Sequence, residues 1–200
     1  MPPEACSSTR QRRNNYSPDV DTEQRLLERI HQGDRKAHRE LYDRLAGTAM
    51  AVALRYVGNQ EAARDVLQES FVKILTHIGS FTYRGEGSLR AWAMRLVSNE
   101  ALNWLKKQQH FQADDDLPED LSEEEEPDVG QIPMEELQRM IQQLPDGYRA
   151  VFCLYVFEQK SHKEIAQLLG IRENSSASQY LRARRMLARS INNYQRQQQL

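Results

Sequence analysis

Apolar residues recur every three or four positions along most of the chain, which is the spacing of one buried helix face. Between residues 21 and 107 this pattern predicts four helices. Asp34 and Asn59 precede helix starts, and Gly33 and Gly58 follow helix ends. The expected core of the first three helices is Leu26, Leu27, Ile30, Leu41, Tyr42, Leu45, Met50, Leu54, Tyr56, Ala63, Val66, Leu67, Phe71, Ile74, Leu75 and Ile78.

The fourth helix, from Ser88 to Lys107, has two faces. Its apolar stripe contains Leu89, Trp92, Ala93, Leu96, Val97 and Leu105. Its polar row contains Arg95, Asn99, Asn103 and Lys106, and Ser88 is the expected N-cap. Cations offset phosphate charge, and an Asn amide can donate to and accept from a base edge. This row favours contact with nucleic acid, and the alternative is an ordinary solvated face.

The C-terminal third predicts a helix-turn-helix. Pro133 opens one helix, and Tyr148 to Phe157 forms a second, which we expect to be buried. A capping box at Ser161–Glu164 starts a short helix that stops at Gly170, and a longer basic helix runs from about residue 174 to 195. The expected DNA contacts are Arg172, Ser175, Ser176, Ser178, Gln179, Arg182 and Arg185, with Arg184 and Arg189 as further phosphate contacts.

Two further segments suggest binding surfaces. The outer side of the third helix carries Asp65, Gln68, Glu69 and Val72, which indicates either a docking surface for a basic partner or plain solvation. The glycine-rich loop from Gly79 to Gly87 contains Phe81, Tyr83 and Arg84. Its aromatic residues could line a pocket for an unstacked base or simply anchor the loop.

These elements predict an all-α protein of two small helical domains. Between Gln108 and Pro133 lie ten acidic residues and no lysine or arginine, and the rest of the chain keeps 19 acidic residues against 27 basic ones. We therefore expect a disordered basic tail over 1–20, a four-helix domain over 21–109, an acidic linker over 110–132 and a helix-turn-helix domain over 133–200.

Several function classes are disfavoured. Neither a membrane-spanning run of about 20 apolar residues nor an export signal is visible. Cys6 and Cys153 lie far apart, as is usual in a reducing cytoplasm. No cofactor motif, metal-ligand spacing or catalytic constellation is evident, so we expect no enzyme. The acidic cluster contains Pro118, Pro127 and Gly130, and it lacks the rigid frame that a metal-dependent nuclease needs.

Taken together, the motifs resemble those of bacterial alternative sigma factors of the extracytoplasmic-function type, over roughly residues 22–188. The first motif is Glu61-Ala62-Ala63, Asp65, Gln68-Glu69 and Phe71. The second is Phe81, Gly85, Gly87-Ser88, Trp92, Arg95, Asn99 and Asn103. The third is Leu144-Pro145, Arg149, Glu164-Ile165-Ala166, Leu169-Gly170-Ile171 and Arg182-Ala183-Arg184.

The resemblance implies a specificity subunit of RNA polymerase, with a region-2-type N-terminal domain and a region-4-type C-terminal domain. Asp65, Gln68, Glu69 and Val72 would dock on the β′ clamp helices. Phe81, Tyr83, Arg84, Ser88, Arg95, Asn99, Asn103 and Lys106 would capture a flipped base of the minus-ten element. The C-terminal helix would read the minus-thirty-five element and its domain would touch the β flap. Members of this family are commonly held inactive by an anti-sigma factor, so such a partner is expected.

The chain departs from the family pattern at two positions. Ser98 replaces a basic residue that is common in the family before the Asn, which weakens one phosphate contact. Ala177 stands where many members have Arg or Lys for a base contact, and Ser176 replaces an aliphatic residue, so binding at minus thirty-five is expected but its base preference is undefined. A free-standing helix-turn-helix regulator would also account for Ser161 to Arg189. The opposite charges of the linker and the two domains further predict a closed free state.

Overall fold

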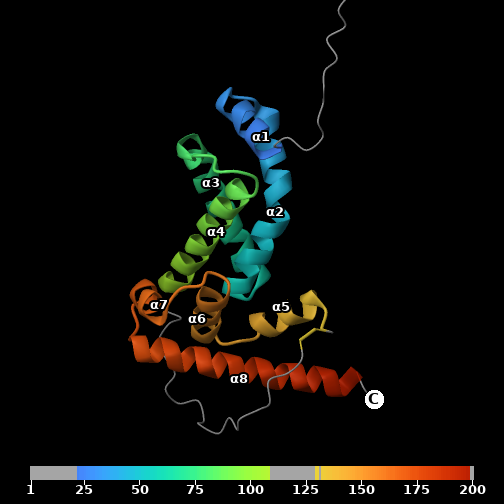
Figure 1. The fold of residues 1–200 in the computed structure, drawn as a ribbon, viewed down its shortest axis with the longest axis vertical. Helices are drawn as coiled ribbons and strands as arrows, with labels where there is room; N and C mark the ends of the chain where they lie inside the picture. The colour runs from blue at the N-terminus through green and yellow to red at the C-terminus, as the bar shows by residue number, and fades with distance from the viewer. Residues whose placement is uncertain (1–21, 109–128, 131, 199–200) are drawn as a thin grey trace, which may run out of the picture.

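The computed structural model describes residues 22–108, 129–130 and 132–198, and within these ranges it contains helices and no strands. The first four helices form an N-terminal body: α1 (Thr22–His31), α2 (Arg35–Val57), α3 (Gln60–His77) and α4 (Ser88–Lys107), with a 3-10 turn η1 (Ile78–Ser80). Four more form a C-terminal body: α5 (Met134–Gln142), α6 (Asp146–Val156), α7 (His162–Leu169) and α8 (Glu173–Gln198). The all-α prediction is confirmed (Figure 1).

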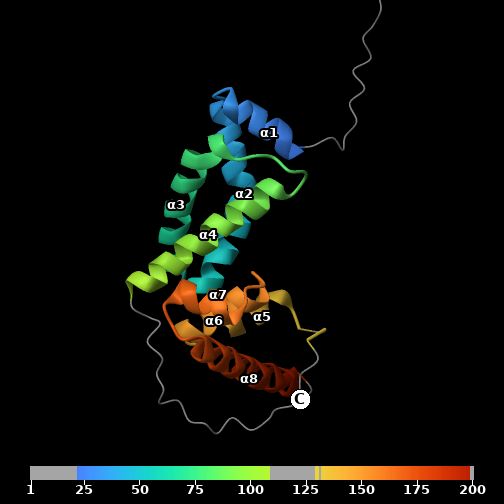
Figure 2. The same ribbon diagram turned by 60° about the vertical axis from the view of Figure 1, so that its left-hand side comes forward.

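Local sequence signals account for most of the N-terminal boundaries. Asp34 caps α2 by accepting from the Lys36 amide, and the Asn59 side chain caps α3 by accepting from the Ala62 amide. Gly58 ends α2 in the left-handed conformation at φ 74°, which favours glycine. The long helices α2, α3 and α4 then pack on one another (Figure 2).

One N-cap prediction is wrong. Ser88 is the first residue of α4 rather than its N-cap, which is Gly87. The carboxylate of Glu23 on α1 takes over the capping role, because it accepts from the amides of Leu89 and Arg90 at 3.1 and 3.4 Å. The Ser88 hydroxyl instead accepts from the Arg84 amide and so ties down the preceding loop.

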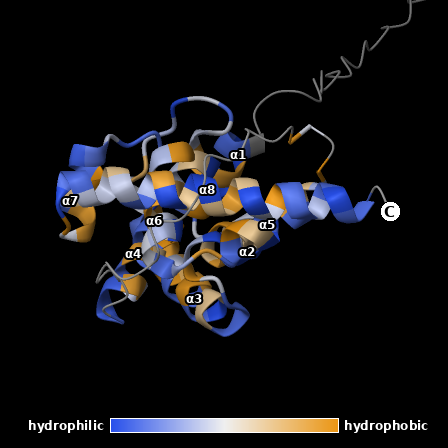
Figure 3. Ribbon diagram, turned by 90° about the horizontal axis from the view of Figure 1, so that it is seen from below, coloured by the Kyte–Doolittle hydropathy of each residue, from blue (hydrophilic) through white to orange (hydrophobic). Residues whose placement is uncertain are grey.

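The C-terminal body forms around α8, which packs against α5, α6 and α7 (Figure 3). One buried cluster joins α8 to α5, to the segments on either side of α5 and to the start of α6. It contains Ile132, Met140, Leu144, Tyr148, Ala183, Leu187 and Ile191. The predicted capping box of α7 is present in full, and Gly170 ends α7 in the left-handed conformation. The helix-turn-helix is therefore built as its spacing predicted.

The two bodies touch directly, since α2 packs against both α5 and α6. A single buried cluster includes N-terminal core residues together with Ala150, Val151, Cys153, Leu154, Ile165 and Leu169. The predicted tail and most of the predicted acidic linker lie outside the described residues. Among the described residues, α5 and α6 are the C-terminal helices that pack on α2 at this contact.

Some residues expected in the core are exposed. They are Tyr42 on α2, Leu75 on α3, Tyr155 and Val156 at the end of α6, and Phe157 directly after it. Leu75 follows Ile74, which occupies the centre of the buried stripe of α3. The apolar run at the end of α6 points to all sides of the helix, and the neighbouring helices cover only part of it. In the part of the chain that the structure describes, no helix is long and apolar enough to cross a bilayer.

Candidate nucleic-acid and partner interfaces

The outer face of α3 combines carboxylates with exposed apolar side chains. Asp65, Gln68, Glu69 and Val72 are all exposed, and Val72 keeps 61% of its surface in solvent. The inner side of α3 is fully occupied by the core of the N-terminal body, so this outer face has one fixed orientation. Apolar surface bordered by negative charge suits a basic, partly apolar partner.

An ion pair links α3 to α4. The Lys73 ammonium contacts the Glu100 carboxylate across the helix interface. The Glu100 side chain is only 9% exposed, whereas that of Lys73 is 42% exposed. The ion pair therefore fixes the outer face of α3 relative to the polar row of α4. The two residues are 27 positions apart, so sequence spacing could not predict this ion pair.

The loop before α4 is organised around an aromatic pair. Phe81 packs against Trp92 with ring centroids 5.0 Å apart, and both rings are half-buried. Tyr83 is also half-buried, whereas Arg84 is exposed. Gly85 and Gly87 adopt positive φ values of 115° and 83°, which let the loop turn sharply into α4. The Phe81–Trp92 contact therefore anchors the loop. The rings of Phe81 and Tyr83 stay partly accessible, and the exposed Arg84 follows Tyr83 in the chain.

The polar row of α4 is exposed along its length. Arg95, Asn99, Asn103 and Lys106 all face solvent, while the opposite side of the helix is buried against α2 and α3. Ser98 is buried, and its hydroxyl donates to the Met94 carbonyl at 3.1 Å. The Phe81–Trp92 contact joins the aromatic loop to α4, the helix that carries this exposed row of cations and amides.

The first turns of α8 differ from the sequence expectation at two positions. Ser176 is fully buried and its hydroxyl lies 3.0 Å from Nδ1 of His162, while Gln179 is 3% exposed. Both lie on the buried stripe of α8 that continues to Ala183 and Leu187, so their side chains do not reach solvent. Oε1 of Gln179 is buried without a hydrogen-bond partner among the described residues. We therefore do not assign base contacts to these two side chains.

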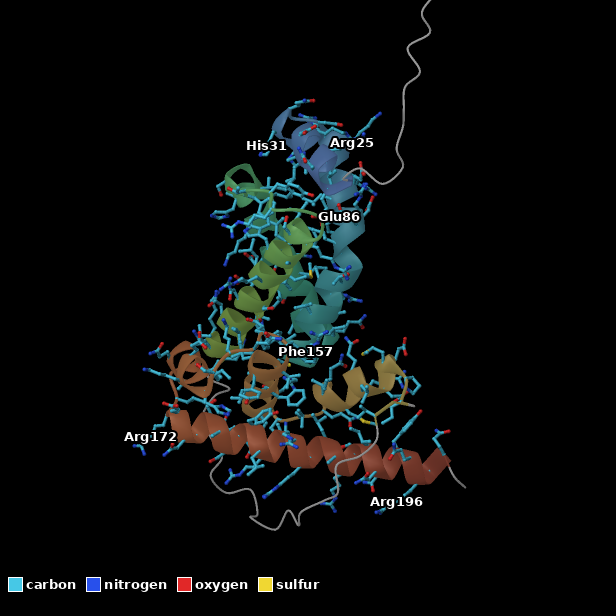
Figure 4. The ribbon with its side chains drawn as sticks, viewed as in Figure 1. Arg25, His31, Glu86, Phe157, Arg172 and Arg196 are labelled. Atoms are coloured by element: carbon cyan, nitrogen blue, oxygen red, sulfur yellow. The ribbon has the colours of Figure 1, made fainter. Side chains whose placement is uncertain are left out.

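Other predicted residues lie on or near the outer side of α8. Arg172 and Ser178 are exposed, as are Arg184 and Arg189, and Ser175 and Arg185 are half-exposed. Arg182 is half-buried and donates to the Tyr148 hydroxyl at 3.3 Å. Arg196, which sequence reasoning did not select, is exposed farther along the helix. Figure 4 shows Arg172 and Arg196 at opposite ends of α8.

The capping box of α7 contains a hydrogen-bonded carboxylate, Glu164, whose contacts depend on pH. The Glu164 carboxylate accepts from the Ser161 hydroxyl and from the Ser161 backbone N–H, and these hydrogen bonds lower the pKa of Glu164. The ionised form therefore holds the start of the helix-turn-helix. The described residues contain no group of three or more His, Cys, Asp or Glu side chains that could hold a metal ion.

Comparison with known proteins places two family models on the chain. The model of sigma-70 region 2 matches residues 41–111, and the model of sigma-70 region 4 matches residues 134–187. The first covers most of the N-terminal body with the polar row of α4. The second covers α5 to α7 and the first half of α8.

Relatives that align with most of this chain are named as RNA polymerase sigma factors. The ECF RNA polymerase sigma-E factor of Haemophilus influenzae is 32% identical over 186 residues, covering 85% of this chain and 95% of that protein. The RNA polymerase sigma-H factor of Pseudomonas aeruginosa is 27% identical over 184 residues, covering 86% and 94%. Among solved structures, CnrH in complex with the cytosolic domain of CnrY aligns at a TM-score of 0.45 with 22% identity, covering 86% and 99%.

Proposed function

The chain belongs to the extracytoplasmic-function sigma factors of the sigma-70 family, and we propose how its surfaces carry out that function. As an alternative sigma factor, it binds core RNA polymerase and directs promoter recognition, DNA melting and transcription initiation. The relatives named above give no support to the free-standing regulator. The proposal concerns which residues meet polymerase, which meet DNA, and where the domains begin and end.

Polymerase docking is assigned to α3. Asp65, Gln68 and Glu69 supply negative charge, and Val72 supplies exposed apolar surface beside it. The partner proposed is the pair of β′ clamp helices. Charge complementarity would raise the association rate and set the orientation, while burial of Val72 would add affinity.

Minus-ten recognition is assigned to the aromatic loop and the polar row of α4. Phe81, Tyr83, Arg84 and Ser88 would surround a flipped base, and Arg95, Asn99, Asn103 and Lys106 would hold the strand. Stacking on an aromatic ring offsets the loss of base stacking in the duplex, and arginine and lysine neutralise phosphate charge. Melting then follows from differential binding, because this surface fits an unstacked strand better than a duplex.

Minus-thirty-five recognition is assigned to the outer side of α8. Arg172, Ser175, Ser178 and Arg185 would contact bases and phosphates. Arg182 stays in the proposal as a phosphate contact, because a guanidinium has five N–H donors and the bond to Tyr148 uses one of them. The same C-terminal body would touch the β flap.

The rest of the proposal follows the family. The region-2 domain would span 21–109 and the region-4 domain 133–200. The acidic segment between them, from Asp114 to Asp128, would run through the RNA exit region and resemble nucleic acid by its charge. We expect a non-catalytic cytoplasmic protein that is held in reserve by an anti-sigma factor.

The observation that carries the DNA assignment is the exposed row on α4 beside the Phe81–Trp92 pair. The test is open-complex formation by reconstituted holoenzyme, on promoters found by transcribing fragmented genomic DNA and sequencing the transcript starts. Arg95→Ala combined with Asn99→Ala should slow promoter opening at least tenfold while core binding stays unchanged. Arg39→Ala, on the exposed surface of α2, is the control. Wild-type opening rates in the double variant would overturn the assignment.

A further inference from the structure

Arg149 of α6 is the most deeply buried cation at the contact between the two bodies. It is only 3% exposed. Its Nε donates to the Tyr56 carbonyl of α2 at 2.8 Å, and its Nη1 donates to the Gln142 and Leu144 carbonyls at 2.9 and 2.6 Å. Nη2 pairs with Asp146. One side chain thus fixes the start of its own helix and also binds the other body.

Arg149 binds at the C-terminal end of α2, and two properties of a helix end favour a guanidinium there. The last carbonyls of a helix lack intrahelical partners, and the helix dipole makes that end negative. Gly58 supplies the space, because a Cβ atom there would lie 2.8 Å from Cζ and from Nη1 of Arg149. The absence of a side chain at Gly58 therefore creates the notch that Arg149 fills.

Further contacts surround this notch. The Tyr56 hydroxyl donates to Oε1 of Glu158 at 2.7 Å, and the Arg55 guanidinium lies 4.1 Å above the Phe157 ring. The Cys153 thiol lies 3.7 Å from the Arg55 carbonyl and is fully buried. Phe157 lies where the C-terminal body meets the N-terminal body (Figure 4). These contacts mix hydrogen bonds, a cation–π contact and packing, as a specific interface does.

The same contact closes over one edge of α4. A cavity of about 360 Å³ lies between the bodies, lined by Ala91, Met94 and Arg95 of α4 and by Phe157, Glu158 and Lys160 of the α6–α7 connection, among others. Arg95 is one of the residues assigned to the promoter strand. In this arrangement a promoter DNA strand bound at Arg95 would run against the C-terminal body, which lies on the other side of this cavity.

The closed arrangement also conflicts with promoter spacing. Elements near minus ten and minus thirty-five are about 25 base pairs apart, which is about 85 Å at about 3.4 Å per base pair. Two bodies in direct contact cannot bind both elements at once. The roughly 24 residues between Gln108 and Pro133 could extend about 80 Å, so separation of the bodies is sterically allowed.

We propose that Arg149 in the Gly58 notch is a latch that holds the free protein in a closed, self-inhibited state, which must open before α4 and α8 engage a promoter. The inhibitory part rests on the DNA contacts proposed above, whereas the closure itself does not. Opening would separate α6 from α2 and uncover Cys153.

Cys153 provides a built-in reporter of opening. Burial raises the pKa of its thiol to about 12, so in the closed state it is both neutral and inaccessible. The only other cysteine is Cys6, so a Cys6→Ser background leaves a single reactive site. The rate at which a thiol reagent modifies Cys153 then measures how often the bodies separate, in the absence of polymerase and DNA.

The test variant is Gly58→Asn, because asparagine tolerates positive φ while its Cβ would collide with Arg149. Three of the four hydrogen bonds of Arg149 lie within its own body, so the collision should push α2 away. Gly33→Asn is the matched control, since Gly33 has φ 78° and a Cβ atom there would meet nothing within 4 Å. Tyr56→Phe is a milder second variant that removes the hydroxyl bonded to Glu158 and also in contact with Ser98 of α4.

We expect Cys153 modification to accelerate at least tenfold in Gly58→Asn, several-fold in Tyr56→Phe and less than twofold in Gly33→Asn. Tryptophan fluorescence should still show a folded N-terminal body in every variant, since both tryptophans lie on α4. Core polymerase should also accelerate modification of the wild-type protein. Equal rates in all four proteins would overturn the latch. A latch confirmed by these rates, without any effect of core polymerase, would overturn its inhibitory role only.

Discussion

The ion pair between Lys73 and Glu100 allows a quantitative test of how α3 and α4 are held together. Lys73→Met removes the ammonium but keeps a long, flexible side chain of similar helix propensity. It leaves the Glu100 carboxylate, which is 9% exposed, without the lysine. Lys73→Met combined with Glu100→Leu removes both charges and leaves apolar side chains of similar size.

The expected magnitude follows from the difference in exposure between the partners. Loss of a partner from a fully buried ion pair costs about 3–5 kcal/mol. The Lys73 end is 42% exposed, so water reaches the site and screens the charge, and we expect about 1–3 kcal/mol for Lys73→Met. The double variant should lie within about 1 kcal/mol of wild type, because replacing both members of a buried pair is often neutral.

Urea unfolding followed by tryptophan fluorescence reports on the N-terminal body, because Trp92 and Trp104 are the only tryptophans and both lie on α4. The control pair is Arg39 and Asp43 on α2, whose side chains are 82% and 61% exposed. Arg39→Met should change the free energy of unfolding by less than about 0.5 kcal/mol. A Lys73→Met protein as stable as wild type, or a double variant as destabilised as the sum of its single variants, would refute the reasoning.

Three further predictions address the surfaces and the helix-turn-helix. Val72→Asp should weaken core polymerase binding at least tenfold without changing the midpoint of urea unfolding. A competition assay against wild type measures the affinity, and an unchanged affinity would remove Val72 from the proposed docking surface. Arg185→Ala should lower the slope of log affinity against log salt by about 0.9 for duplex promoter DNA, and an unchanged slope would exclude a phosphate contact. Glu164→Gln should be less stable than wild type above about pH 4.3, the usual pKa of an unfolded glutamate. Because the folded pKa of Glu164 is lowered, that difference should vanish as pH falls through it, whereas a difference independent of pH in thermal unfolding would contradict the assigned contact.

Helix boundaries that depend on neighbouring residues could be predicted from the sequence. Asp34, Asn59 and the Ser161–Glu164 box all cap the helices they precede, and Gly58 and Gly170 end theirs. Each signal acts within a few residues, so spacing alone is sufficient to find it. The helix-turn-helix and the polar row of α4 were predictable for the same reason.

Contacts between distant residues could not be predicted. Glu23 caps α4 from 66 residues away, and Arg149 reaches Tyr56 over a separation of 93 residues. The burial of Ser176 and Gln179 did leave a signal, because they lie seven and four positions before Ala183 on its buried stripe. Their polar chemistry suggested a base contact, although their spacing placed them inside.

The most direct measurement of the sigma-factor function is capture of the purified full-length protein by immobilised core RNA polymerase. Wild type and Arg39→Ala should bind stoichiometrically, and Asp65→Arg combined with Gln68→Ala should not, because it reverses the charge at the centre of the α3 face. Capture of the Asp65/Gln68 variant at the wild-type level would remove the docking surface from α3. Failure of wild type to bind core, together with nanomolar binding to duplex DNA by the protein alone, would contradict the sigma-factor function itself.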